Sequence, residues 1–191
     1  MTAQTWRAHY EQKYQYSLRL FLLLNCVSAA LSLLSPLFTI VTVTLPCALI
    51  CAASLGLLLW NWKFPQQKIN IPVISLLFGM LWAWHIVIKA SLLPPPHFNF
   101  LVIALLSILF IGTIAFSNNI IAFTLHSLPT FIVCLALAGG EQWMRMFYCF
   151  VLPVAGITLQ NIMQKRSDNF TQGLMDKLLQ ERNTLNDLSM L

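Results

Sequence analysis

Acidic residues are scarce in this chain of 191 residues, which has only six Asp and Glu and none between Glu11 and Glu141. Charged residues make up 9% of the sequence and hydrophobic residues 58%, whereas an ordinary soluble domain is roughly 25% charged. A soluble domain with so long a gap would have little to keep its surface solvated. The composition therefore excludes a water-facing globule and predicts a chain embedded in a lipid bilayer.

Several functional motifs are also missing. The five cysteines form no CxxC pair and lie in apolar stretches, which indicates free thiols and not a secreted disulfide framework. The sequence has no Ser/His/Asp arrangement, no glycine-rich phosphate loop and no HExxH motif, so we assign no catalytic residue. The net charge of +5 is spread over the chain ends and short connections, which predicts no nucleic acid partner.

Long apolar runs predict an all-α fold, a polytopic bundle of six transmembrane helices, because a bilayer core needs about 20 mainly apolar residues per helix. We place the helices at residues 17–35, 41–62, 71–90, 99–116, 120–138 and 144–162. The predicted organisation is an interfacial helix at 1–16, a transmembrane sensor domain at 17–162 and a cytoplasmic signalling helix at 163–191. Trp6, Tyr10 and Tyr14 recur every fourth residue and would give the interfacial helix an aromatic face.

Lys and Arg are distributed unevenly on the two sides of these spans. With the N-terminus inside, nine of the eleven basic residues lie on the cytoplasmic side and only Lys89 and Arg145 lie outside. The positive-inside rule then predicts a multi-pass protein of a bacterial inner membrane with both termini in the cytoplasm. Five tryptophans are expected as interface anchors near span ends: Trp60, Trp62, Trp82, Trp84 and Trp143.

Two features within the spans predict helix packing. Asn25 is expected to form an interhelical hydrogen bond in the first span. Ala48, Ala52 and Gly56 form a stripe of small residues that would let another helix approach closely, either inside the bundle or in a dimer.

Histidines are the candidate ligand or signal residues. His85 in LWAWHIVIK and His126 in TLHSLPT are ionisable groups within spans, where such groups are costly and often functional. Each is either a neutral imidazole bonded to a neighbouring helix or part of a ligand, haem or metal site. At 1.5 Å per residue, His85 would lie about 20 Å from the inner boundary of the membrane and His126 about 9 Å. One metal ion could bind both only if a helix were broken or shifted, and Pro129 makes such a kink possible. His97 in PPPHF is axially closer to His85.

Metal signals are otherwise weak. Two histidines alone do not make a site, because zinc and copper sites need three or four ligands. Cys47 and Cys51 share a helix face at i and i+4 and could bind a soft metal, although core packing is the favoured interpretation. We therefore assign no metal.

Leucines recur at heptad spacing near the end of the chain. Leu174, Leu178, Leu185 and Leu188 fit alternating a and d positions, with Glu181 in the intervening slot. Three or four heptads with one charged slot make a marginal coiled coil. We expect a parallel homodimer whose seam is formed by these leucines.

The end of the chain, LQERNTLNDLSML at 179–191, resembles the signalling helix that precedes a GGDEF diguanylate cyclase domain, where such a stretch leads into a DxLTGLxNRR motif. The six spans without a periplasmic insert resemble the layout of membrane-associated sensor domains joined to such cyclases. The resemblance implies a sensory and dimerisation module that controls a GGDEF domain in cis. In that family two facing domains, each with GTP and Mg²⁺, make cyclic di-GMP.

The family's catalytic residues do not occur in this chain. It has no GG(D/E)EF sequence, no RxxD site and no metal-binding acidic pair, so we expect the output domain and its GTP and Mg²⁺ to lie outside it. Two alternatives remain, the sensor region of a membrane histidine kinase and a small transporter or channel. The lack of a membrane-buried carboxylate argues against a coupled transporter. Pro153 and Gly156 could bend the last span, which must carry the input to the connector.

Overall fold

The computed structural model describes residues 3–34 and 41–190, and these residues form helices and no strand. The helices are α1 (Ala3–Leu33), α2 (Val41–Lys63), α3 (Ile71–Leu92), α4 (Phe98–Ala115), α5 (Ile120–Ala138) and α6 (Gln142–Ser189). All six are long and apolar enough to cross a membrane. The predicted all-α bundle of six spans is confirmed, and the ends of α2 to α5 lie within about two residues of the predicted ranges.

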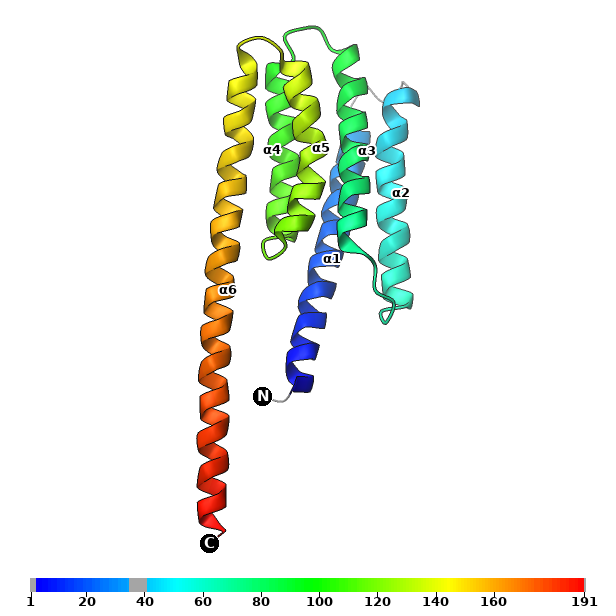
Figure 1. Ribbon diagram of the computed structural model, residues 1–191. Coiled ribbons are helices and arrows are strands. Elements are labelled where there is room, and N and C mark those ends of the chain that lie inside the picture. The colour runs from blue at the N-terminus through cyan, green and yellow to red at the C-terminus, as the bar shows by residue number, and fades with distance from the viewer. Residues whose placement is uncertain (1–2, 35–40, 191) are drawn as a thin grey trace.

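The helices run alternately up and down, so that both termini lie at the same end of the bundle (Figure 1). We call this the termini end and the other the opposite end. Asparagines start two of the helices: the Asn70 side chain accepts a hydrogen bond from Val73 N and the Asn119 side chain accepts one from Ala122 N. The turn before α6 uses positive φ angles at Gly139 and Gly140, a conformation that glycine adopts without strain.

The first and last helices extend beyond the predicted spans. Residues 3–16, expected as an interfacial helix, are continuous with the first span in α1. On its aromatic face Tyr10 is exposed and Tyr14 donates a hydrogen bond to Ile69 O, while the Trp6 side chain lies outside the described residues.

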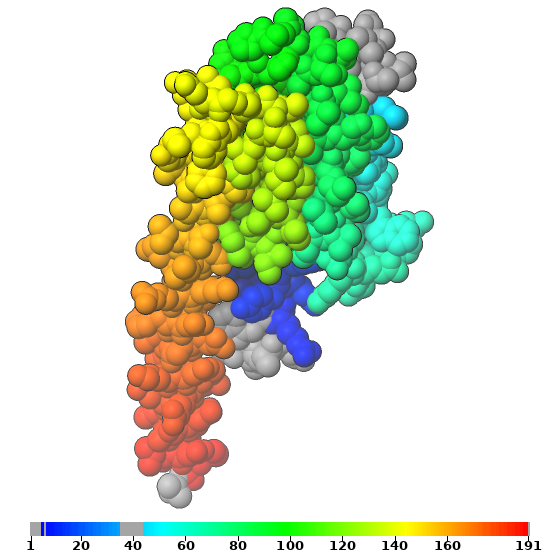
Figure 2. Space-filling view, turned by 45° about the horizontal axis from the view of Figure 1, so that its top comes forward, coloured from blue at the N-terminus to red at the C-terminus, as the bar shows by residue number. Residues whose placement is uncertain are grey.

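The last span and the connector are likewise one helix of 48 residues, α6, which is unbroken at Pro153. Its C-terminal part, coloured orange to red, projects past the bundle and stands clear of the other helices (Figures 1 and 2). Within the bundle, α6 packs against α4 and α5.

The centre of the bundle is a close crossing of α3 and α5, the pair of helices with the most extensive contact. A Cβ on Gly79 of α3 would lie 2.5 Å from the backbone oxygen of His126 on α5. A Cβ on Gly112 of α4 would lie 2.8 Å from the Phe123 ring, also on α5. These two glycines therefore let α3 and α4 approach α5 at the level of His126.

Two of the three residues in the small-residue stripe of α2 face away from the bundle. A Cβ on Gly56 would meet nothing within 4 Å, and Ala52 is exposed. Of the two alternatives for this stripe, packing inside the bundle does not hold at these two positions, because α2 turns that face outward.

Candidate sensory site in the helical core

His126 is fully buried in the middle of the bundle. Its ring meets the ring of Phe21 on α1 edge to face, with the centroids 5.0 Å apart, and that of Phe116 at 6.5 Å. The ring is thus contacted by aromatic side chains of α1 and of the residue that follows α4, while Gly79 brings the backbone of α3 against the backbone of α5 at His126. A movement of α5 at this point would therefore disturb its packing against three other helices.

Two side chains in this part of α5 have polar atoms without a hydrogen-bond partner in the described part of the chain. Neither His126 Nδ1 nor Nε2 has a hydrogen-bond partner, and Thr130 Oγ1, one turn further along, has none. The Ser75 backbone interacts electrostatically with the imidazole but meets hydrogen-bond geometry with neither nitrogen. Leaving a buried donor or acceptor without a partner costs about 1–3 kcal/mol. In the described part of the chain His126 therefore lacks a hydrogen bond of ordinary geometry, and the interhelical hydrogen bond considered from the sequence stays a prediction.

His85 has a different environment. Its Nδ1 lies 3.4 Å from Cys47 Sγ of α2, and its ring lies 5.9 Å from the ring of Trp82 in an edge arrangement. It is buried, with 4% of its surface exposed. The imidazole therefore has a polar partner on the neighbouring helix, as one of the two sequence interpretations predicts.

Trp82 links the two histidine environments. Its Nε1 donates a hydrogen bond of 2.8 Å to Asn25 Oδ1, and Asn25 Nδ2 donates one of 2.8 Å to Phe21 O. The predicted interhelical bond of Asn25 is confirmed. Trp82 is only 6% exposed, so its assignment as an interface anchor was wrong, whereas the other four tryptophans are exposed: Trp60, Trp62, Trp84 and Trp143.

The two buried histidines do not share a site. His126 lies at the level of Gly79, and His85 is six residues further along α3, about 9 Å along its axis. The helix α5 continues through Pro129 without a break, so the condition for a shared metal is not met. No group of three His, Cys, Asp or Glu side chains in the described ranges is arranged to hold a metal ion.

The remaining candidate ligands have separate places. Cys47 contacts His85, whereas the Sγ of Cys51 lies 3.9 Å from that of Cys26 on α1. His97 immediately precedes α4 at the opposite end, where it is half-buried and its Nδ1 has no partner in the described part of the chain.

The heptad leucines lie on the projecting part of α6. They are 47%, 59%, 65% and 63% exposed, in the order Leu174, Leu178, Leu185 and Leu188. An aligned row of apolar side chains outside the bundle is typical of an interaction surface. We call these four residues the leucine seam.

The Asn25–Trp82 bond offers a test of how strongly the core network couples α1 to α3. Asn25→Leu and Trp82→Phe, made singly and together, form a double-mutant cycle. We expect a coupling energy of about 0.6 kcal/mol and at most about 1.7, the range found for hydrogen bonds between membrane helices. The measurement is reversible unfolding of the purified protein in mixed micelles. A coupling energy of zero would show that the bond adds nothing to the packing of these helices.

No family model, curated protein or solved structure matches this chain. Its function therefore has to be inferred from its own residues and geometry.

Proposed function

We propose that this chain is a membrane-embedded sensory and dimerisation module that controls a diguanylate cyclase domain placed after α6. The observation that carries the proposal is α6 itself, a single helix from Gln142 to Ser189. Its first part is packed in the bundle. Its last part, which begins at Met163 and is about 40 Å long, presents the leucine seam. The resemblance of residues 179–191 to a signalling helix supports a cyclase as the output domain.

A packing route connects the candidate sensory site to this helix. His126 and Thr130 lie about one turn apart on α5, and Phe131 directly follows Thr130. The ring of Phe131 stacks on that of Phe150 of α6, with the centroids 3.9 Å apart and the rings 10° from parallel. Phe131 also contacts Phe147 at 6.2 Å. A ligand or a new hydrogen bond at His126 that shifts α5 would move these rings and displace α6. The paired α6 helices would then change the distance or rotation of the two output domains.

The proposed orientation places both termini in the cytoplasm of a bacterial inner membrane. Both termini are at one end of the bundle (Figure 1), and nine of eleven basic residues belong to that side. Lys89 and Arg145 are at the opposite end, where each lies over a phenylalanine ring of α4. Lys89 lies over Phe100 and Arg145 lies over Phe98. The charge asymmetry supports the orientation under the positive-inside rule.

Cysteine crosslinking tests the proposed dimer. A Leu178→Cys variant should form a disulfide with its twin about tenfold faster than a Lys177→Cys variant, because a and d side chains meet in a parallel coiled coil and neighbouring outward positions do not. Both positions are exposed in the single chain, so accessibility does not favour either. The rates are read from non-reducing gels of membranes treated with a mild oxidant, with the unsubstituted chain as a control for its own cysteines.

The same variant tests the orientation. A membrane-impermeant maleimide should label Leu178→Cys in inverted vesicles and not in intact cells with a permeabilised outer membrane. Equal crosslinking rates at the two positions would contradict the leucine seam. Labelling from the periplasmic side would contradict a cytosolic cyclase.

A further inference from the structure

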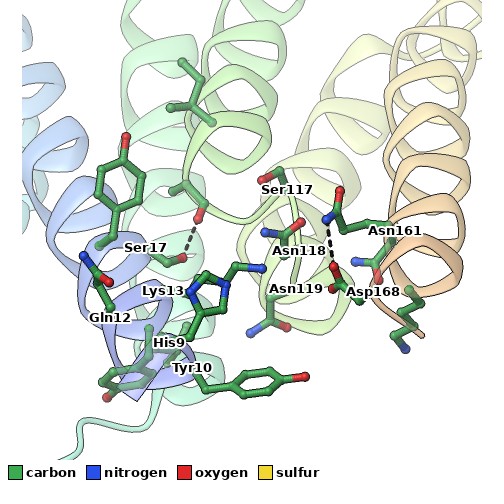
Figure 3. Close-up of a pocket in the computed structure, with 17 residues that line it drawn as sticks. His9, Tyr10, Gln12, Lys13, Ser17, Ser117, Asn118, Asn119, Asn161 and Asp168 are labelled. Carbon is green, nitrogen blue, oxygen red and sulfur yellow. Dashed lines mark hydrogen bonds between the residues drawn. The ribbon is translucent and has the colours of Figure 1, made fainter. Parts of the chain in front are cut away.

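A pocket of about 660 Å³ opens at the termini end, between α1, the α4–α5 connection and α6 (Figure 3). The part of α1 that precedes the predicted first span forms one wall, and the part of α6 around the predicted span end forms another. Lys13 approaches from α1 and Asp168 from α6, while Asn118 and Asn119 lie between them in the connection (Figure 3). The pocket thus joins two helices whose main packing contacts are with other helices.

Asn161 provides an independent sign of a ligand. This residue of α6 is 7% exposed, lines the pocket and points toward it (Figure 3). Its Nδ2 is buried and has no hydrogen-bond partner among the described residues. An amide nitrogen is a donor, and buried donors in folded proteins are normally satisfied. The missing partner is therefore an acceptor atom.

The lining combines positive charge with an apolar wall. Two lysines, Lys13 and Lys165, line the pocket together with one carboxylate, Asp168. The Oδ1 of Asp168 already accepts a hydrogen bond of 3.2 Å from Gln164. On the side toward the bundle the wall is apolar, with Ile71, Ile114 and Ala115. Cationic donors at the water side and apolar groups at the membrane side suit a molecule with an anionic head and a hydrocarbon tail.

We propose that this pocket binds a phosphate-bearing amphiphile, with the phosphate between Lys13 and Lys165 and one of its oxygens accepting from Asn161 Nδ2. Phosphate supplies several acceptor oxygens and a charge that two lysines compensate, which a neutral headgroup does not. An anionic membrane phospholipid and a soluble phosphate ester share this chemistry, but only the lipid would also use the apolar wall.

The regulatory consequence rests on the proposed function. A molecule held by Lys13 of α1 and by Lys165 and Asn161 of α6 would fix the direction in which α6 leaves the bundle. Lipid composition would then set how readily the leucine seams of two chains meet. Binding itself does not depend on this consequence and is measured separately.

Binding is tested with the purified full chain in a neutral detergent, titrated with phosphatidylglycerol, phosphatidylcholine, glycerol 3-phosphate and inorganic phosphate. Native mass spectrometry counts the bound molecules, and thermophoresis gives Kd. We expect saturable binding of phosphatidylglycerol, and a Kd about tenfold higher in the double variant Lys13→Gln/Lys165→Gln. The matched control is Lys63→Gln/Lys68→Gln, which removes the same charge at the same end but outside the pocket. It should keep the original Kd.

Asn161→Leu is the second test, since it removes the unpartnered donor without changing the charge. It should also raise the Kd of phosphatidylglycerol, by about threefold to tenfold, the size of one hydrogen bond. A second outcome is that glycerol 3-phosphate binds with the same Kd as the lipid and with the same dependence on the two lysines. That result would support the phosphate site and identify a soluble ester as its ligand. Equal losses in the two double variants, or no binding of any phosphate-bearing probe, would overturn the proposal.

The crosslinking rate of Leu178→Cys separates this inference from the proposed function. Phosphatidylglycerol should change that rate in the chain with intact lysines and not in the Lys13→Gln/Lys165→Gln background. Lysine-dependent binding with an unchanged crosslinking rate would support the pocket and count against control of a dimer through α6.

Discussion

A Gly79→Ala variant should unfold with a free energy about 1–3 kcal/mol lower than that of a Gly56→Ala variant. The added methyl group of Gly79→Ala would lie 2.5 Å from the backbone oxygen of His126, and backbone cannot rotate away as a side chain can. The helices α3 and α5 would have to separate at their closest point. At Gly56 the methyl group meets nothing within 4 Å. Both substitutions gain up to about 1 kcal/mol of helix propensity, so the difference between them isolates the clash.

Gly112→Ala provides an intermediate case. Its methyl group would lie 2.8 Å from the Phe123 ring, which is a side chain and has some freedom to move, although it is fully buried. We expect a loss between those of the other two variants. Chemical unfolding in mixed micelles gives the three free energies. If Gly79→Ala and Gly56→Ala unfold alike, α3 and α5 do not cross as closely as the structure has them.

A His126→Leu variant should insert and fold normally but should abolish the response of a fused GGDEF domain to its stimulus or leave the cyclase fixed on. Leucine has a similar size and removes two nitrogens that have no partner in the described part of the chain. Because an unsatisfied buried polar group costs about 1–3 kcal/mol, the variant should be as stable as the original or more stable by that amount. Higher stability with lost function is typical of a polar group kept for function.

His85→Leu is the matched control, because His85 is also buried in a span but contacts Cys47 Sγ at 3.4 Å. Its replacement removes a satisfied contact and should bring no gain in stability. The output is measured as cyclic di-GMP in cells that express each fusion at equal levels. If both variants respond as the original does, neither histidine senses the stimulus. Absence of a Soret band and of bound transition metal in the purified protein would exclude the haem and metal forms of the proposal.

The positions of the spans could be read from the sequence because the bilayer imposes a simple requirement on length and polarity. The helices α2 to α5 have short polar connections, and Asn70 and Asn119 mark the starts of α3 and α5. Asn25 was also identified correctly, since an amide in an apolar span has to find a partner on another helix.

Which face of a helix turns inward was not predictable in the same way. The stripe that contains Gly56 and the glycine at Gly79 look alike as local sequence, but only Gly79 faces another backbone. Trp82 has an amphipathic ring that suits the membrane surface equally well, and its burial is decided by Asn25, 57 residues earlier in the chain. The buried face depends on how each helix is rotated about its axis. These helices are apolar on every side, so the periodicity of the sequence does not mark that face.

The pocket at the termini end was not predicted for a related reason. Its walls come from four separate segments of the chain. The sequence also predicted a boundary between residues 162 and 163, where the structure has an unbroken helix. Asn161, in the last turn of the predicted span, was the available signal, because a polar side chain there is unusual in so apolar a segment.

The continuity of α6 has a mechanical consequence. Because the helix is unbroken from Gln142 to Ser189, the part beyond the bundle acts as a stiff arm about 40 Å long, and a tilt of about 5° would move its tip by roughly 3.5 Å. Apolar side chains are in contact only when their heavy atoms come within about 4.0–4.5 Å. A rearrangement of the core too small to open the bundle would therefore be enough to engage or separate the leucine seams of two chains, and the separation would be greatest at the end where the output begins.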